Sequence, residues 1–247
     1  MNKTIQSVWV GPRPLSAMEQ LCIRSYLRVG HEFHLYSYEP VHGVPPGTVI
    51  RDANEIIPFS ELPYTAFKSF AAFSDYFRYK LLLDRGGWYC DTDTVCLRPF
   101  DFEDDHVIAS ENRGSQKQHA TGSFLKAPAG SALAGYCWNI CCRTSPSQAQ
   151  KPWGRVGPLL VEQAVRVLDM RSCVKPTWTF CPVPWWEVKR LVTRGSIVEH
   201  LGAETYAIHL WNEVWERAGL DRNVFPPESP YAYLREVYGR ESAPGER

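Results

Sequence analysis

Apolar and polar side chains at the start of the chain follow two different spacings. Residues 5–10 alternate, which predicts a strand. A capping-box pattern at Ser16 opens a run with helical spacing that reaches Gly30, and residues 33–38 again have the pattern of a strand. This order predicts a parallel sheet with a right-handed crossover, and ligands usually bind at the carboxyl ends of such strands.

Residues 66–85 are predicted to form a long helix. Its apolar side chains recur at helical spacing, at Phe70, Phe73, Phe77 and Leu81. Gly86 has the position of a residue that ends a helix in a left-handed turn. A short apolar strand at 88–90 follows and leads directly to Asp91 and Asp93.

The rest of the chain divides into shorter elements. Strands are predicted at residues 49–51, 107–110 and 123–126, a strand or a buried loop at 205–210, and helical segments at 52–57, 132–142, 159–168 and 231–238. Polar or proline-rich loops are predicted at 111–121 and 181–186. Because no linker or repeat interrupts this order, we expect one α/β domain over residues 1–241, with a mostly parallel central sheet flanked by helices. A disordered tail is predicted at 242–247.

The two aspartates that follow the strand at 88–90 suggest a metal site. Two carboxylates at the exit of a buried strand are unfavourable unless a cation neutralises them. Hard oxygen ligands suit Mg²⁺ or Mn²⁺. We therefore hypothesise that Asp91 and Asp93 hold a divalent metal against the phosphates of a nucleotide sugar.

Three further polar residues have both a structural and a functional interpretation. Asp75 and Arg78 lie three apart on the predicted helix, so they form either a surface ion pair or a pair facing the two aspartates. In the second case Asp75 accepts hydrogen bonds from sugar hydroxyls, and Arg78 donates to the sugar or to phosphate. Taken alone, a single histidine such as His209 is more often structural than a metal ligand.

Composition excludes some classes of function. Lys and Arg together number 27, as do Asp and Glu, so the chain lacks the basic excess of a nonspecific nucleic-acid binder. Its eight cysteines contain no C-x-x-C pair, which argues against a zinc knuckle and favours reduced, buried thiols. There is no apolar run of about 18 residues and no signal-peptide core. We expect a cytoplasmic protein; peripheral membrane association and an anchor outside this sequence stay open.

The stretch from Ser74 to Asp93 resembles a known family. Its pattern is S-D-x-x-R-Y-x-x-L-x-x-x-G-G-x-Y-x-D-x-D. This pattern is similar to the DXD sugar-binding region of glycosyltransferase family 32 and to the glucosylating domain of large bacterial toxins. Three other segments agree, at residues 7–11 (SVWVG), 153–160 (W-G-x-x-G-P-x-L) and 207–212 (AIHLWN). The resemblance implies a GT-A fold with a Rossmann-like sheet, a UDP-sugar donor, and Mn²⁺ or Mg²⁺ as the cofactor.

The same resemblance implies a set of site residues. The implied catalytic residues are Asp75, Arg78, Asp91 and Asp93. The implied donor-binding residues are Trp9, Val10, Asp75, Arg78, Gly87, Asp91, Thr92, Gly157 and Pro158, with Trp9 at the uracil. The implied metal ligands are Asp91, Asp93 and His209, although Asp91 alternatively contacts ribose or reaches the metal through water. The resemblance also implies retention at the anomeric carbon, for which we identify no covalent nucleophile.

The chain departs from the family in one strand, because relatives often carry Asn where residues 119–123 read HATGS. The expected reaction moves a hexose or N-acetylhexosamine from a UDP-sugar to a hydroxyl of a glycan, small molecule or protein. Two alternatives stay open: a nucleotide-sugar or carbohydrate-binding protein without turnover, and a metal-dependent phosphohydrolase. Within the transferases, a toxin-like enzyme that modifies a protein also stays open.

Overall fold

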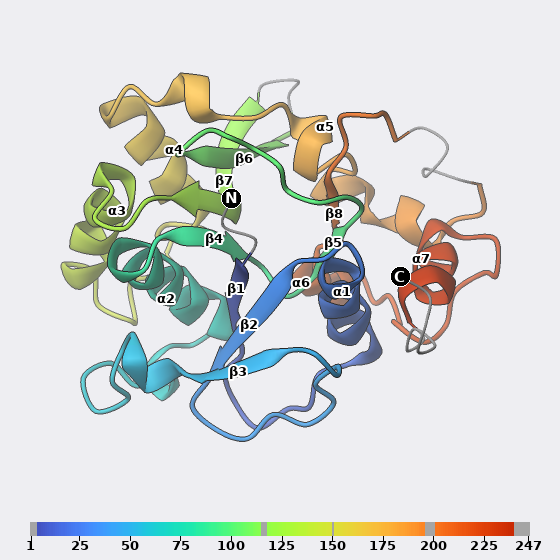
Figure 1. The fold of residues 1–247 in the computed structure, drawn as a ribbon, viewed down its shortest axis with the longest axis horizontal. Helices are drawn as coiled ribbons and strands as arrows, with labels where there is room; N and C mark the ends of the chain where they lie inside the picture. Colours follow the sequence, from blue (N-terminus) through green and yellow to red (C-terminus); the bar gives the residue numbers. More distant parts are fainter. Residues whose placement is uncertain (1–3, 115–117, 150, 196–200, 240–247) are drawn as a thin grey trace.

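The computed structural model describes residues 4–114, 118–149, 151–195 and 201–239, and it centres on a six-stranded sheet (Figure 1). The strand order is β3 (Val49–Asp52), β2 (Glu32–Ser37), β1 (Thr4–Val8), β4 (Gly87–Cys90), β7 (Gln118–Ala127) and β6 (Val107–Asn112). Pairing is parallel from β3 to β4, whereas β7 runs antiparallel to both of its neighbours. The α/β fold with a mostly parallel sheet is therefore confirmed.

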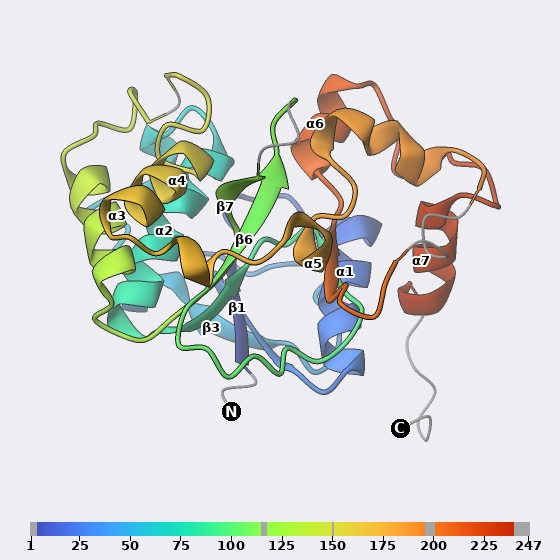
Figure 2. The same cartoon turned by 90° about the horizontal axis from the view of Figure 1, so that it is seen from above.

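Helices cover both faces of the sheet (Figure 2). One layer contains α2 (Phe70–Asp84), α3 (Ala132–Cys142) and α4 (Pro158–Val167). The other contains α1 (Ala17–Arg28), α7 (Pro230–Tyr238), and the two-stranded ribbon of β5 (Thr94–Cys96) and β8 (Ala207–His209). Successive residues of β4 serve the two layers, since Trp88 packs into the core around α1 and Tyr89 into the core around α2.

The start of the chain forms as predicted. The Ser16 side chain accepts a hydrogen bond from the Met18 backbone N–H, and the Glu19 carboxylate accepts one from the Ser16 N–H at 2.7 Å. This capping box begins α1. Strand β1 pairs in parallel with β2 over its whole length, and it also pairs in parallel with β4. The carboxyl end of β1 therefore lies beside that of β4 and points toward the site.

Helix α2 is shorter than the predicted helix over residues 66–85. Ser69 caps it, and Tyr64–Ala66 form a separate 3-10 turn. Gly86 follows the helix with a φ of +65°, and a Cβ there would collide with the backbone before α3. Phe70 belongs to the predicted apolar stripe but is 41% exposed, because it lies in the first turn at the edge of the cavity described below.

The predicted loop at 111–121 is wrong. Strands β6 and β7 form an antiparallel hairpin that includes the pairs Glu111↔His119 and Asn112↔Gln118, so most described residues of that range are strand. The predicted irregular segment at 181–186 is correct only in its first part, since Trp185 begins a 3-10 segment. These polar residues form strands because each strand supplies backbone hydrogen bonds to the other, and the composition of one segment does not reveal such a partner.

The remaining described elements are short. They are α5 (Thr177–Phe180), α6 (Asn212–Arg217), and 3-10 turns at Ala53–Glu55, Arg171–Cys173 and Trp185–Val192. Within the described ranges, every helix is too short or too polar to cross a bilayer. All eight cysteines are free and six are buried. The tail predicted at 242–247 lies outside the described residues.

Candidate functional site

The turn after β4 presents Asp91 and Asp93. Strand β4 is almost entirely buried. Beyond it, the Asp91 N–H donates to the Ser123 carbonyl at 3.0 Å, and the Thr94 hydroxyl donates to the Asp91 carbonyl at 2.6 Å. These bonds close a tight turn before β5. Both carboxylates therefore emerge at the carboxyl end of β4, where the sequence pattern places them.

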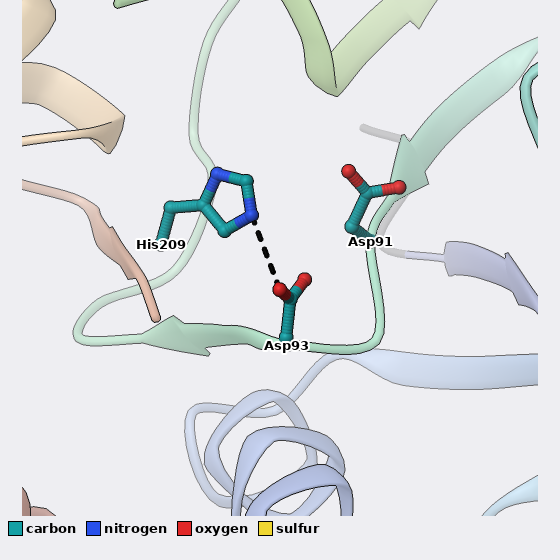
Figure 3. Close-up of side chains that lie close together, drawn as sticks. All are labelled: Asp91, Asp93 and His209. Carbon is teal, nitrogen blue, oxygen red and sulfur yellow. Dashed lines mark ion pairs between the residues drawn. The ribbon is translucent and has the colours of Figure 1, made fainter. Parts of the chain in front are cut away.

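Strand β8 brings His209 to the same turn from a distant part of the sequence. It pairs antiparallel with β5, so that Thr94 lies opposite His209. Beyond that pair, the Leu210 N–H donates to the Asp93 carbonyl at 2.9 Å, and the Asn212 N–H donates to the Asp93 carboxylate at 2.8 Å. The His209 Nε2 lies 3.3 Å from Oδ2 of Asp93 (Figure 3). Backbone pairing thus holds the imidazole and the carboxylate together.

Asp91, Asp93 and His209 form a compact cluster of potential metal ligands. One ligand atom from each lies within 4.8 Å of the others, and Figure 3 shows His209 facing the two aspartates. The Trp211 ring stacks on the His209 imidazole with centroids 3.7 Å apart, which fixes the orientation of the imidazole. Two carboxylates and an imidazole are donors that suit a divalent metal.

Burial and mutual contacts set the protonation of this cluster. Burial raises the pKa of Asp91, although Arg78 opposes the shift. Burial also acts to raise the pKa of Asp93, but the His209 imidazole and the Asn212 N–H outweigh it and lower that pKa. For His209, burial acts to lower the pKa, yet the Asp93 carboxylate raises it well above its ordinary value. A metal that binds here must replace the imidazolium proton.

Arg78 joins two carboxylates beside the turn. Its Nη1 donates to Asp75 at 2.9 Å, and its Nη2 donates to Asp91 at 2.6 Å. The guanidinium also lies 4.7 Å from the ring centroid of Tyr89. Arg78 is only 3% exposed, which excludes the interpretation of Asp75 and Arg78 as a surface ion pair. The two carboxylates engage one N–H of each terminal nitrogen, so Arg78 orients both carboxylates, and each terminal nitrogen keeps a second N–H.

Two glycines pack against this buried ion pair. A Cβ at Gly122 would lie 2.1 Å from Nη1 of Arg78, and a Cβ at Gly157 would lie 2.6 Å from Oδ2 of Asp75. A side chain at either position would displace the pair. Gly157, which was expected to bind the donor, thus packs against the Asp75 carboxylate. Burial raises the pKa of Asp75 to about 7, despite the attraction of Arg78.

The cluster opens into a cavity of about 420 Å³. Among the expected site residues, those that line it are Trp9, Val10, Asp75, Arg78, Asp91, Thr92, Asp93, Pro158 and His209. The structure does not bring Gly87 there, because Gly87 begins β4, at the end of the strand remote from Asp91. Most of the residues that the sequence analysis expected at the site therefore line one cavity.

Several lining residues escaped the sequence analysis as site residues. They include Arg13, Phe70, Glu111, Gly122, Trp153, Trp185, Trp211 and Asn212. Of these, Gly122 offered a signal, since a glycine inside a strand often marks a close approach of another group. Trp153, Trp211 and Asn212 stand in the segments 153–160 and 207–212 that resemble the family, but Trp185 offered no signal, because an isolated indole has the same sequence appearance in a core and in a cavity.

Residues 44–114 match the family model described as "Glycosyltransferase sugar-binding region containing DXD motif", which confirms the resemblance seen at residues 74–93. A solved structure named PaToxG Glycosyltransferase aligns with a TM-score of 0.53 at 16% identity, covering 69% of this chain and 72% of that chain. The comparison with curated proteins found no match. The chain is therefore glycosyltransferase-like: it carries a DXD-type sugar-binding region on a fold that it shares with a glycosyltransferase.

Proposed function

We propose that the protein is a metal-dependent, retaining glycosyltransferase that moves a hexose or N-acetylhexosamine from a UDP-sugar to an acceptor hydroxyl. The observation that carries the proposal is the cluster of Asp91, Asp93 and His209 in a cavity lined by the sugar-binding region. Two of the three ligands are carboxylates, and an oxygen-rich ligand set favours Mn²⁺ or Mg²⁺.

The metal ligands in this proposal are Asp93, His209 and Asp91, the last directly or through water. Mn²⁺ or Mg²⁺ held there supplies positive charge to the diphosphate that leaves. Asp93 is already the best-oriented ligand, since the Asn212 N–H and the β5–β8 pairing hold it. Arg78 favours the ionised form of Asp91 against the effect of burial and fixes its carboxylate by a hydrogen bond, so Arg78 is a positioning residue.

The rest of the donor site follows the cavity wall. Trp9, Val10 and Thr92 lie where β1 and β4 end, and we assign them to the base and ribose. Asp75 accepts hydrogen bonds from hydroxyls of the transferred sugar, with Pro158 beside it at the first turn of α4. Gly87 has no place in this assignment, and Gly157 acts by leaving room for Asp75.

The reaction balances without a covalent nucleophile from the protein. The bond between the anomeric carbon and the diphosphate breaks, and its electron pair leaves with the diphosphate. The acceptor oxygen forms the new bond on the same face, and its proton passes to the departing diphosphate. Retention rests on the family resemblance, and NMR of the product anomer tests it. Free thiols throughout the chain suit a reducing compartment, which supports a cytoplasmic location.

The direct test is release of UDP from a panel of UDP-sugars in the presence of Mn²⁺. We expect release with at least one donor and its loss in EDTA. Asp93→Asn should abolish metal-dependent UDP binding while the chain stays folded, whereas Asp84→Asn, at an exposed ion pair on α2, should bind UDP normally. A folded protein that binds no donor would refute the proposal. Binding without any turnover would favour the carbohydrate-binding alternative.

A further inference from the structure

Among the described tryptophans that line the cavity, Trp185 is the one whose indole has no hydrogen bond or cation–π partner. Trp9 and Trp211 also line the cavity, but their indole N–H groups donate to the carbonyls of Arg13 and Val183. Trp185 is 40% exposed, and its described ring contact is an edge-to-face pair with Trp186. A large exposed indole on a cavity wall is typical of a surface that receives a ligand.

A buried carboxylate lies in the same cavity and has no role in the donor site. Glu111 is 3% exposed and lines the cavity from β6. It accepts a hydrogen bond from Nε of Arg113 at 2.9 Å, which fixes its side chain. The Cys181 thiol lies 3.8 Å from the Ser123 hydroxyl on β7, the strand that pairs with β6, so the segment that leads to Trp185 runs beside the hairpin that carries Glu111. A flat apolar ring and a fixed carboxylate thus belong to one region of the wall.

We propose that Trp185 and Glu111 form the acceptor subsite and that the acceptor is a glycan. A pyranose ring has an apolar C–H face that can stack on Trp185, and hydroxyls at its edge that can donate to Glu111. This inference rests on the proposed function, since it supplies the hydroxyl that the transferase needs. It selects carbohydrate from the acceptor classes that the sequence leaves open.

The 3-10 segment of Trp185 carries charges of both signs. Glu187 binds Arg190 at 2.7 Å, and Lys189 is exposed. Glu111 adds a negative charge within the cavity. Trp186 is equally exposed, at 40%, but does not line the cavity, so it separates a role in the cavity from a role of the outer surface.

The test is saturation-transfer NMR with methyl α- and β-pyranosides of glucose, galactose, mannose and N-acetylglucosamine. The protein is saturated with UDP and Mg²⁺, since Mn²⁺ is paramagnetic. We expect transfer to at least one glycoside, with C–H protons of one ring face receiving most of it. Trp185→Ala should lower the affinity for that glycoside about tenfold, and Trp185→Phe should retain most of the affinity. Glu111→Gln should also lower the affinity for the glycoside.

Trp186→Ala and Trp178→Ala are the matched controls, because both side chains are exposed and neither lines the cavity. Both should bind the glycoside like the unmodified protein. The inference is overturned if the UDP-loaded protein contacts no glycoside, or if Trp185→Ala binds normally. It is also overturned if Trp185→Ala and Trp186→Ala equally abolish binding to phosphatidylglycerol vesicles, which would assign the pair to a membrane. Failure to bind UDP would instead refute the proposed function.

Discussion

At the scale of single residues, Arg78 has the most unusual environment. Its guanidinium is buried and neutralises two carboxylates, one on its own helix and one on the turn after β4. The spacing of Asp75 and Arg78 was visible in the sequence. Whether that pair faced water or the site was not, because exposure depends on which face of α2 packs on the sheet.

Removal of the Arg78 guanidinium should be strongly destabilising. Arg78→Ala leaves Asp75 and Asp91 buried without their cation, so we expect the free energy of unfolding to fall by about 3–5 kcal/mol. Lys80→Ala is the control, since Lys80 forms an exposed ion pair with Asp84 on the same helix and should change stability by less than about 1 kcal/mol. Urea unfolding measures both. Equal effects of the two substitutions would contradict the buried role of Arg78.

Asp75 should make stability depend on pH. Its pKa is about 7 in the folded protein against an ordinary 3.8, because burial disfavours the carboxylate. The folded state therefore holds this proton more tightly than the unfolded state, and its stabilising effect is lost as the pH rises from 3.8 to about 7. Asp75→Asn lacks this loss, so its stability relative to the unmodified protein should rise over that range.

Urea unfolding at a series of pH values, in EDTA, checks this expectation. Asp84→Asn at the exposed end of α2 serves as the surface control. If the difference in free energy of unfolding between Asp75→Asn and the unmodified protein stayed constant from pH 4 to 8, the shifted pKa of Asp75 would be disproved.

At the scale of elements, local patterns predicted well where one element contains its own signals. The capping box at Ser16 gave α1, and the helical spacing before Gly86 gave α2. Both strands of the β6–β7 hairpin were predicted in part, but their continuation into residues 111–121 was missed because the hydrogen-bonding partners lie across the strands. Likewise, Glu111 and Trp185 line the cavity only through the way the elements pack together.

Strand β7 contributes to the site by a missing side chain. Gly122→Ala places a methyl group against Nη1 of Arg78, so we expect about 1–3 kcal/mol of destabilisation and weaker UDP binding. Gly135→Ala is the control, because its Cβ would lie 3.8 Å from Leu83 in open helical geometry. That variant should be neutral or stabilised by up to about 1 kcal/mol. Thermal unfolding and UDP titration would compare the two variants. Normal UDP affinity in Gly122→Ala would argue against a role of this close packing in the site.

A metal at the cluster would link the β4–β5 turn to β8, so it should stabilise the fold. At a Mn²⁺ concentration about 100 times the Kd, the expected gain is about 2.7 kcal/mol. Thermal unfolding with Mn²⁺ and with EDTA measures it. His209→Ala should lose the gain, whereas His34→Ala, at an ion pair on β2 away from the site, should keep it. A gain that persists in His209→Ala would move the metal elsewhere.

At the scale of the whole molecule, the cavity lies between parts of the chain that no local pattern connects. Trp153 belongs to the segment before α4, and its ring lies 5.6 Å from the guanidinium of Arg217 on α6. Figure 2 shows α4 and α6 in different parts of the molecule. Trp153 and Arg217 both line the cavity, so their contact joins two walls of the cavity that come from distant parts of the chain. The sequence singled out the segment of Trp153, while its contact with Arg217 arises from tertiary structure.

Loss of that contact should let UDP leave faster. Trp153→Ala removes the cation–π partner of Arg217, so we expect the UDP dissociation rate with Mn²⁺ to rise about two- to fivefold. Trp178→Ala is the control, because Trp178 is 56% exposed and does not line the cavity. Stopped-flow fluorescence gives both rates. An unchanged rate in Trp153→Ala would mean that the contact does not retain the nucleotide.

The pairing of β5 with β8 also has a consequence for synthesis of the protein. A ribosome completes β1, β2, β4 and both aspartates long before it adds Ala207–His209. Until then, β5 has no partner strand and Asp93 lacks the backbone N–H groups of Leu210 and Asn212. A nascent chain therefore acquires His209, the third of the proposed metal ligands, and the partner strand of β5 in one step, so unfinished copies would lack the complete cluster of Asp91, Asp93 and His209.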